Sequence, residues 1–200
     1  MRSLMYSSPQ FYTFSLRAIH GKDLDRRYRE IAKIACHRRV FEVGCGPAFL
    51  GRYIGRERYS GMDINERLVR YAVKEGYDCM VGDIFKDEFP EADVGVAVDV
   101  LHHITPREKE LIERMRESFK EIIVIEPVCA FNVRLPESLR KLWDSVFGDA
   151  DGINPFENRQ RWQFTEKELM EYMKEMGAIR TYTLGRDVVA IFKGRKHRDI

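Results

Sequence analysis

The sequence predicts an α/β fold in which helices cover both faces of a mainly parallel sheet. Three observations lead to this prediction. Short apolar runs alternate with segments of helical periodicity along most of the 200 residues. The first run, 40–43, leads through a glycine turn directly into a helix. The last two runs, 179–184 and 187–192, are joined by a tight turn at Gly185 and Arg186 and should be antiparallel. Strands that alternate with helices in this way form sheets wound on both sides.

Length and composition favour one domain. Two hundred residues can form a full core, and no linker rich in Pro, Gly or Ser divides them. No segment approaches the roughly 18 apolar residues of a membrane span, and residues 1–10 lack the apolar stretch of a signal peptide, so we expect a cytoplasmic location without membrane contact. A net charge of +2 does not demand a nucleic-acid partner. No metal site is expected, because the cysteines lack ligand spacing; they are Cys36, Cys45, Cys79 and Cys129.

Residues 1–38 are predicted to be an N-terminal helical segment that helps to cover the site. Its first part, 1–22, is rich in aromatic residues, and apolar residues recur at helical spacing over 23–37. Residues 39–200 should form the main domain. Within it, 127–163 interrupts the alternation of strands and helices with three prolines and several aromatics, and we interpret it as an inserted substrate cover.

The remaining elements follow from apolar runs and capping signals. Asn65 is a plausible N-cap residue, and both Thr105 to Glu108 and Thr165 to Glu168 have the pattern of a capping box. Proline at position 106 would suit the first helical position. Strands are therefore expected over 59–63, 79–83, 93–98 and 121–126, and helices over 49–54, 66–75, 106–119, 136–147 and 166–176.

The glycine turn after the first strand is predicted to bind a ligand. Gly44 and Gly46 allow a sharp turn, and the helix that follows brings backbone N–H groups and a positive helix end to this point. The dinucleotide fingerprint has a third glycine, but Phe49 stands at that position, and no Gly-Lys-Ser/Thr follows. The turn therefore indicates a ligand that brings no pyrophosphate close to the backbone.

Each of the first three strands carries an acidic residue at or near its end. Glu42 can meet an ammonium group, Asp63 can accept both hydroxyls of a ribose, and Asp83 can accept the amino group of a purine. Carboxyl ends of parallel strands meet at one edge of a sheet, where open α/β sheets bind their ligands. Three carboxylates without a converging cation favour a cationic adenosine ligand that lacks phosphates. S-adenosylmethionine fits that description.

Five stretches together resemble the successive motifs of the class I S-adenosylmethionine-dependent methyltransferases: VFEVGCGPAFL, YSGMDI, MVGDIF, ADVGVAVDVLHHI and IIVIEPV. The resemblance covers about residues 39–193 and implies a Rossmann-like, doubly wound, seven-stranded sheet of order 3-2-1-4-5-7-6 with strand 7 antiparallel. VLHHI is similar to the branch that methylates small molecules. The resemblance and the strand-end acids together imply these cofactor-binding residues: Glu42, Gly44, Cys45, Gly46, Asp63, Ile64, Asp83, Ile84 and Asp99.

Several residues are candidates for contact with the methyl acceptor, and each has a structural alternative. His102 or His103 can take a proton from the acceptor, or can pack and cap the loop at 100–104. Glu126 ends a strand at the cleft. Aromatics of the insertion and of the N-terminal segment can wall the acceptor site or form the insertion's own core; they include Tyr12, Trp143 and Trp162.

Three functions remain open from the sequence. A small-molecule methyltransferase is favoured, because the Asn/Asp-Pro-Pro-Tyr pattern of amino methylases is missing where the fourth strand ends in Asp99-Val100-Leu101-His102. A methyltransferase acting on RNA or protein is the second. A non-catalytic subunit that binds the cofactor and supports a partner is the third. The oligomeric state and the methylated atom are not indicated.

Overall fold

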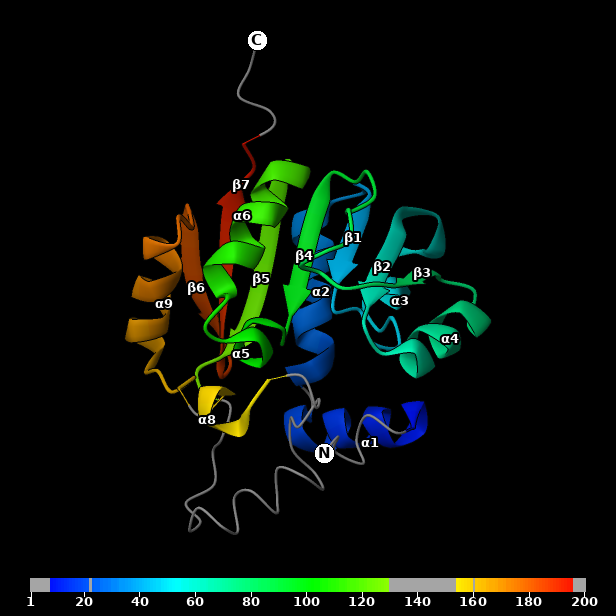
Figure 1. Ribbon diagram of the computed structural model, residues 1–200, viewed down its shortest axis with the longest axis horizontal. Coiled ribbons are helices and arrows are strands. Elements are labelled where there is room, and N and C mark those ends of the chain that lie inside the picture. Colours follow the sequence, from blue (N-terminus) through cyan, green and yellow to red (C-terminus); the bar gives the residue numbers. More distant parts are fainter. Residues whose placement is uncertain (1–7, 22, 130–153, 160, 196–200) are drawn as a thin grey trace.

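A seven-stranded sheet forms the centre of the molecule (Figure 1). The computed structural model describes residues 8–21, 23–129, 154–159 and 161–195. The strand order is β3-β2-β1-β4-β5-β7-β6, and only β7 runs antiparallel to its neighbours, so the predicted topology is confirmed. The strands are β1 Val40–Val43, β2 Tyr59–Asp63, β3 Asp78–Val81, β4 Val94–Val98, β5 Glu121–Pro127, β6 Arg180–Leu184 and β7 Asp187–Lys193.

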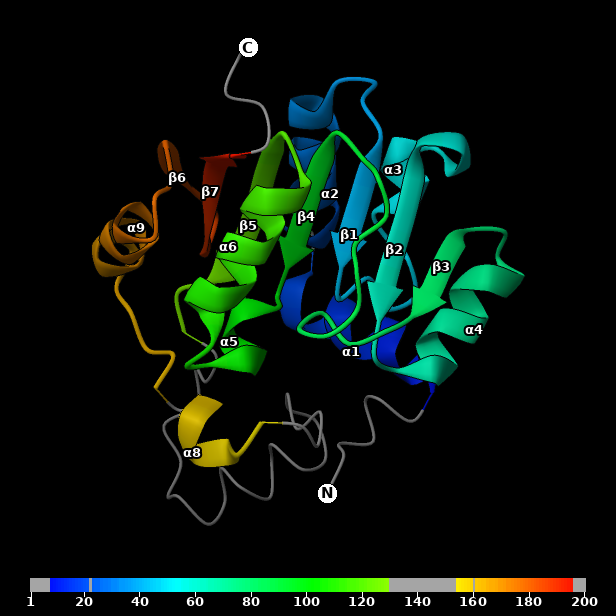
Figure 2. The ribbon, with the colours of Figure 1, turned by 45° about the horizontal axis from the view of Figure 1, so that its top comes forward.

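The helices cover both sheet faces and the edge where the parallel strands end. The described helices are α1 Pro9–His20, α2 Asp23–Ala35, α3 Gly51–Ile54, α4 Glu66–Lys74, α5 Leu101–Ile104, α6 Glu108–Ser118, α8 Phe156–Arg159 and α9 Glu166–Glu175. Both ribbon views show α1 lying across the carboxyl edge of the sheet, with α8 at the same edge (Figures 1 and 2). A short 3₁₀ turn, Arg56–Arg58, precedes β2.

Alternating side chains of the sheet pack into two hydrophobic layers, one on each face. In β5, Ile123 and Ile125 pack with residues of α2, whereas Ile122 and Val124 pack with residues of α6 and α9. All four side chains are fully buried. The near-continuous apolar runs of β4 and β5 therefore reflect strands that are covered on both faces.

One of the two predicted capping boxes is confirmed and the other is wrong. Thr165 caps α9 by accepting the Glu168 backbone N–H, and the Glu168 side chain reaches back to the Thr165 N–H. Thr105 instead ends the preceding short helix, α5, where its hydroxyl donates to the Leu101 carbonyl oxygen. Arg107 takes the N-cap position of α6, without a side-chain hydrogen bond. The short helix α5, which was not expected from the sequence, ends just before Thr105 and accepts a hydrogen bond from its hydroxyl.

Some expectations cannot be compared with the described structure. The helical stretch expected over 136–147 and Trp143 lie outside the described residues. Among the described helices, none combines the length and the apolar character needed to cross a bilayer.

Gly95 in β4 tests the packing between the sheet and α6. An added Cβ would lie 2.2 Å from Cδ2 of Phe119, which is fully buried and stacked on Phe41. Gly95→Ala should therefore lower the free energy of unfolding by roughly 1–3 kcal/mol, as overpacked cores do. Urea unfolding of the variant, of Phe119→Leu and of the double variant would measure the coupling. The smaller leucine should recover part of the loss, and purely additive effects would contradict this packing.

Candidate functional site

A cavity of about 330 Å³ opens at the carboxyl edge of the sheet. Its wall is formed by residues from the turns after β1, β2, β3 and β4, and from α1 and α8. Most of the lining is apolar, while a few carboxylates, amides and one histidine are exposed in it. This composition is typical of a small-molecule site.

The glycine turn after β1 has the conformation that only glycine adopts easily. Gly44 and Gly46 have φ values of 69° and 51°, a region that side chains disfavour. A Cβ on Gly44 would also lie 2.6 Å from Cγ2 of Val100. Gly44 lines the cavity, and the Gly46 N–H donates to Oδ2 of Asp63 at 2.8 Å. The turn after β1 is thus tied to the end of β2.

Asp63 and Asp83 lie in one wall with Ile64 and Ile84. The second Asp63 oxygen accepts the Asn65 N–H at 2.7 Å, so two backbone donors fix this carboxylate.

Asp83 is held in a different way, because one of its oxygens accepts the Phe85 N–H and the other pairs with Lys86 at 2.9 Å. Lys86 lowers the pKa of Asp83, which keeps it ionised. The structure therefore brings together two predicted acids and their two apolar neighbours.

Glu42 and Cys45 are not among the residues that line the cavity. Strand alternation places Glu42 on a sheet face with Val40, and it accepts the Tyr59 hydroxyl at 2.5 Å. Burial raises the pKa of Glu42 well above its usual range, and the Tyr59 hydrogen bond offsets this only in part. Cys45 links the turn to β2, because its backbone N–H donates to the Met62 carbonyl oxygen at 3.0 Å. Both residues support the turn from within the core.

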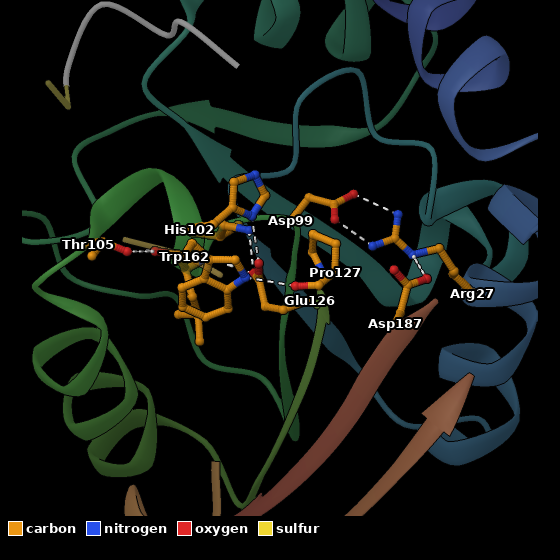
Figure 3. A network of polar contacts seen from close by, with 10 residues as sticks. Arg27, Asp99, His102, Thr105, Glu126, Pro127, Trp162 and Asp187 are labelled. Carbon is orange, nitrogen blue, oxygen red and sulfur yellow. Dashed lines mark hydrogen bonds and ion pairs between the residues drawn. The ribbon is translucent and has the colours of Figure 1, made fainter. Parts of the chain in front are cut away.

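Asp99 lines the cavity and is held by a residue that the sequence analysis missed. Arg27 of α2 is fully buried and donates two hydrogen bonds to Asp99, at 2.7 and 2.5 Å. Its Nε also lies 3.0 Å from Oδ2 of Asp187, at the start of β7 (Figure 3). Positions 27 and 99 are far apart in the sequence, and no local pattern distinguishes Arg27 from its exposed arginine neighbours on α2.

Glu126 is fully buried and does not line the cavity, but it takes part in a hydrogen-bond network (Figure 3). One oxygen accepts the backbone N–H groups of Val100 and Leu101 at 2.6 and 2.7 Å, and the other lies 2.7 Å from Nδ1 of His102. Opposite an ionised carboxylate, which only accepts, the donor in this contact is Nδ1–H of His102. His102 is 3% exposed, whereas His103 stacks on it with ring centroids 4.2 Å apart and lines the cavity. Of the two histidines, only His103 lines the cavity.

Ligand atoms of Asp99, His102 and Glu126 lie within 4.8 Å of one another, a spacing that can hold a metal ion. All three side chains already have partners, however. Asp99 is bound by Arg27, and His102 and Glu126 are bound to each other. Glu126 also accepts a backbone N–H group. A metal ion would have to compete with these contacts. The geometry is that of a hydrogen-bond and ion-pair network.

The predicted acceptor residues divide between the cavity and the core. Tyr12 lines the cavity, with its ring against Gly46. Trp162 is 1% exposed and donates from Nε1 to the Pro127 carbonyl oxygen at 2.7 Å, so it does not line the cavity. The lining residues that the sequence did not predict include Arg107, Asn154 and Asn158. The two asparagines form a chain in which Asn158 donates to Asn154 and Asn154 donates to the Thr105 carbonyl oxygen.

Comparisons with known proteins agree with this architecture. A family model described as a methyltransferase domain matches residues 41–122. The trans-aconitate 2-methyltransferase of Mycobacterium tuberculosis is 35% identical over 83 residues, which are 38% of this chain and 31% of that protein. The chain thus spans about a third of the length of the curated relatives it matches.

Solved methyltransferases share the fold over nearly the whole chain. Human N-acetylserotonin methyltransferase in complex with S-adenosylmethionine superposes with a TM-score of 0.60 at 21% identity, covering 96% of this chain and 58% of that one. The S-adenosylmethionine-dependent methyltransferase of Thermotoga maritima gives 0.63 at 16%, covering 96% and 100%. Magnesium protoporphyrin IX methyltransferase of Synechocystis with bound S-adenosylhomocysteine gives 0.61 at 17%, covering 92% and 88%. At these identities the likeness shows the fold.

The buried Glu42 carboxyl predicts a pH effect on stability. Its pKa is raised in the folded state, so between the unfolded and the folded pKa the unfolded chain ionises first and stability falls as pH rises. The glutamine of Glu42→Gln cannot ionise. The free energy of unfolding of this variant should therefore be close to that of the wild type below about pH 4. Above that pH it should exceed the wild-type value by up to about 1.4 kcal/mol more for each pH unit. Urea unfolding of both proteins at pH 4, 6 and 8 measures this difference, and a constant difference would contradict it.

Proposed function

We propose that the chain is a class I S-adenosylmethionine-dependent methyltransferase that binds S-adenosylmethionine in the cavity and methylates a small-molecule acceptor. The observation that carries the proposal is the shared wall of the glycine turn, Asp63 and Asp83. In this pose, Asp63 binds the ribose hydroxyls and Asp83 accepts the adenine amino group. Ile64 and Ile84 flank the adenine ring, and the amino-acid part passes Gly44 and Gly46 toward Asp99.

The residues present fit an adenosine ligand that carries an ammonium group. Both oxygens of Asp63 are oriented by backbone donors, so the carboxylate needs no rearrangement to accept hydroxyl groups. The described lining residues contain three carboxylates and a single arginine, Arg107, which is paired with Glu110 and lies 3.5 Å over the Phe85 ring. A pyrophosphate would face mainly like charges here, which is unfavourable.

When bound, S-adenosylmethionine supplies a methyl group made electrophilic by its sulfonium. The protein contributes alignment and a dry cavity. Positioning of two reactants can be worth about 7–11 kcal/mol, whereas a general base typically contributes 10²–10⁴-fold. His103 is the histidine placed to accept a proton from the acceptor, because it lines the cavity. His102 and Glu126 hold α5, and therefore His103, from behind.

The small-molecule acceptor is supported by the additional walls around the cavity. Tyr12 of α1, Asn154 just before α8 and Asn158 within α8 add walls beyond the strand ends, and the cavity measures about 330 Å³. We propose that α1 and residues 127–163 together cover the acceptor. Trp162 would stabilise this cover from the core, through its bond to Pro127, and Glu126 would act indirectly, through His102.

Isothermal titration with S-adenosylhomocysteine tests the cofactor site directly. Asp63→Ala should weaken binding by roughly 1–3 kcal/mol, because ribose hydroxyls and the Gly46 N–H lose their acceptor. Asp78→Ala is the matched control, since Asp78 is exposed at the amino end of β3, opposite the cavity. Equal affinities of the two variants would remove Asp63 from the site, and comparable affinity of the wild type for NAD would contradict the proposed ligand.

Turnover of the isolated chain decides among the functions. Release of S-adenosylhomocysteine in the presence of a panel of amines, phenols, thiols and carboxylic acids supports a small-molecule enzyme. Transfer only to RNA or protein would replace the proposed acceptor class. Tight cofactor binding with no transfer to any acceptor would favour a non-catalytic subunit.

The proposed cover predicts a difference between two aromatic residues of α1. Tyr12 faces the cavity, whereas Phe14 is 68% exposed. Tyr12→Ala should weaken S-adenosylhomocysteine binding by roughly 1–2 kcal/mol, because a large aromatic surface no longer covers the ligand. Phe14→Ala should leave affinity within about twofold of the wild type. If titration shows the same affinity for both variants, α1 does not cover the site.

A further inference from the structure

We propose that Arg27 is a positioning residue for the cofactor: it holds the Asp99 carboxylate in the orientation that receives the ammonium group of the amino-acid part of S-adenosylmethionine. The N-terminal segment would then contribute to cofactor binding through α2 as well as covering the site through α1. This inference rests on the proposed function, because it assigns a role toward the same cofactor.

The contacts of Arg27 are those of a residue that sets the geometry of another. Its guanidinium is fully buried and forms a fork with both oxygens of Asp99 (Figure 3). Two parallel hydrogen bonds from a guanidinium define both the position and the plane of a carboxylate. The single ammonium group of a lysine side chain cannot do this. The third contact, with Asp187 at 3.0 Å, anchors the guanidinium to the start of β7. Arg27 thus connects α2 to two strands at the sheet edge.

Asp99 needs such support because its backbone conformation is unfavourable. Its φ is 56°, in the left-handed region that non-glycine residues rarely occupy. Its N–H donates to the Ile125 carbonyl oxygen at 3.0 Å, which connects it to β5. The side chain remains 20% exposed and lines the cavity. Each carboxylate oxygen can accept more than one hydrogen bond, so the bonds from Arg27 leave capacity for a donor from the ligand.

The charges at this position favour a cationic ligand group. Burial by itself lowers the pKa of the Arg27 guanidinium, but the ion pairs with Asp99 and Asp187 raise it above its ordinary range. Arg27 therefore stays charged while it is shared between two carboxylates. On the other side of Asp99, Glu126 and His102 lie within 4.8 Å and form a pair of their own. An ammonium group entering the cavity at Asp99 would meet a carboxylate already held in place.

A purely structural role for Arg27 makes a different prediction. If Arg27 only stabilised the sheet edge, its loss would weaken every ligand of the cavity to a similar extent. If Arg27 orients Asp99 toward the ammonium group, only ligands that carry this group should be affected. S-adenosylhomocysteine has the amino-acid part, and 5′-methylthioadenosine lacks it while keeping the adenosine.

The experiment is titration of both ligands into the wild type, Arg27→Lys and Arg26→Lys. Lysine keeps the charge at position 27 and removes the fork, and Arg26 is the exposed neighbour on the same helix. We expect Arg27→Lys to weaken S-adenosylhomocysteine at least tenfold and to change 5′-methylthioadenosine less than twofold. Arg26→Lys should leave both affinities as in the wild type. Equal losses for the two ligands, or no loss for either, would overturn the proposal.

If Arg27→Lys does not fold, Asp99→Asn tests the role of the Arg27–Asp99 pair toward the ammonium group. This variant keeps the shape of the side chain and removes its charge, so it should show the same selective loss for S-adenosylhomocysteine. An unselective loss or an unchanged affinity in Asp99→Asn contradicts the role assigned to the pair. Failure of the proposed function has its own signature, since the wild type would then bind neither ligand.

Discussion

Parallel strands that end at one edge of a sheet constrain this molecule more than any other feature. β1, β2, β3 and β4 all run toward the edge where the cavity opens, and each is followed by a turn that must satisfy backbone groups no longer paired in the sheet. The structure satisfies several of them with carboxylates. Asp63 accepts N–H groups from two different turns, and Glu126 accepts two at the start of α5. The acids that form the site are therefore also part of what holds the edge together.

This double use explains why the site can be rigid before a ligand arrives. A buried carboxylate without partners would be costly. Here Asp83, Asp99 and Glu126 each accept hydrogen bonds from backbone donors or from a cation. Asp99 is the extreme case, because its unfavourable φ and its charge are both stabilised by one arginine. Breaking a buried pair of this kind typically costs several kcal/mol. Positioning by ion pairs thus ties the shape of the cavity to the stability of the fold.

The sequence was most informative where function and topology follow local patterns. Apolar runs located every strand, and an acid after a strand located Asp63 and Asp83, because both depend on residues adjacent in the chain. The sequence was misleading at Thr105, where a neighbouring helix takes the hydroxyl that was expected to cap α6. Strand alternation decides the placement of Glu42, which points into the core and accepts the Tyr59 hydroxyl. Arg27 was out of reach, since only the packing of α2 against the ends of β4 and β7 distinguishes it from its neighbours.

The residues that form or support the cavity come partly from the stretch that the family model matches and partly from segments outside it. The family model covers residues 41–122, which contain the glycine turn and the strand-end acids proposed to bind the adenosine part. Outside that stretch lie Arg27 and Tyr12, from the N-terminal segment, and Asn154 and Asn158, from the insertion. Tyr12, Asn154 and Asn158 line the cavity beyond the strand ends. The residues proposed to bind the adenosine part thus lie within the matched stretch, whereas much of the remaining wall comes from segments outside it.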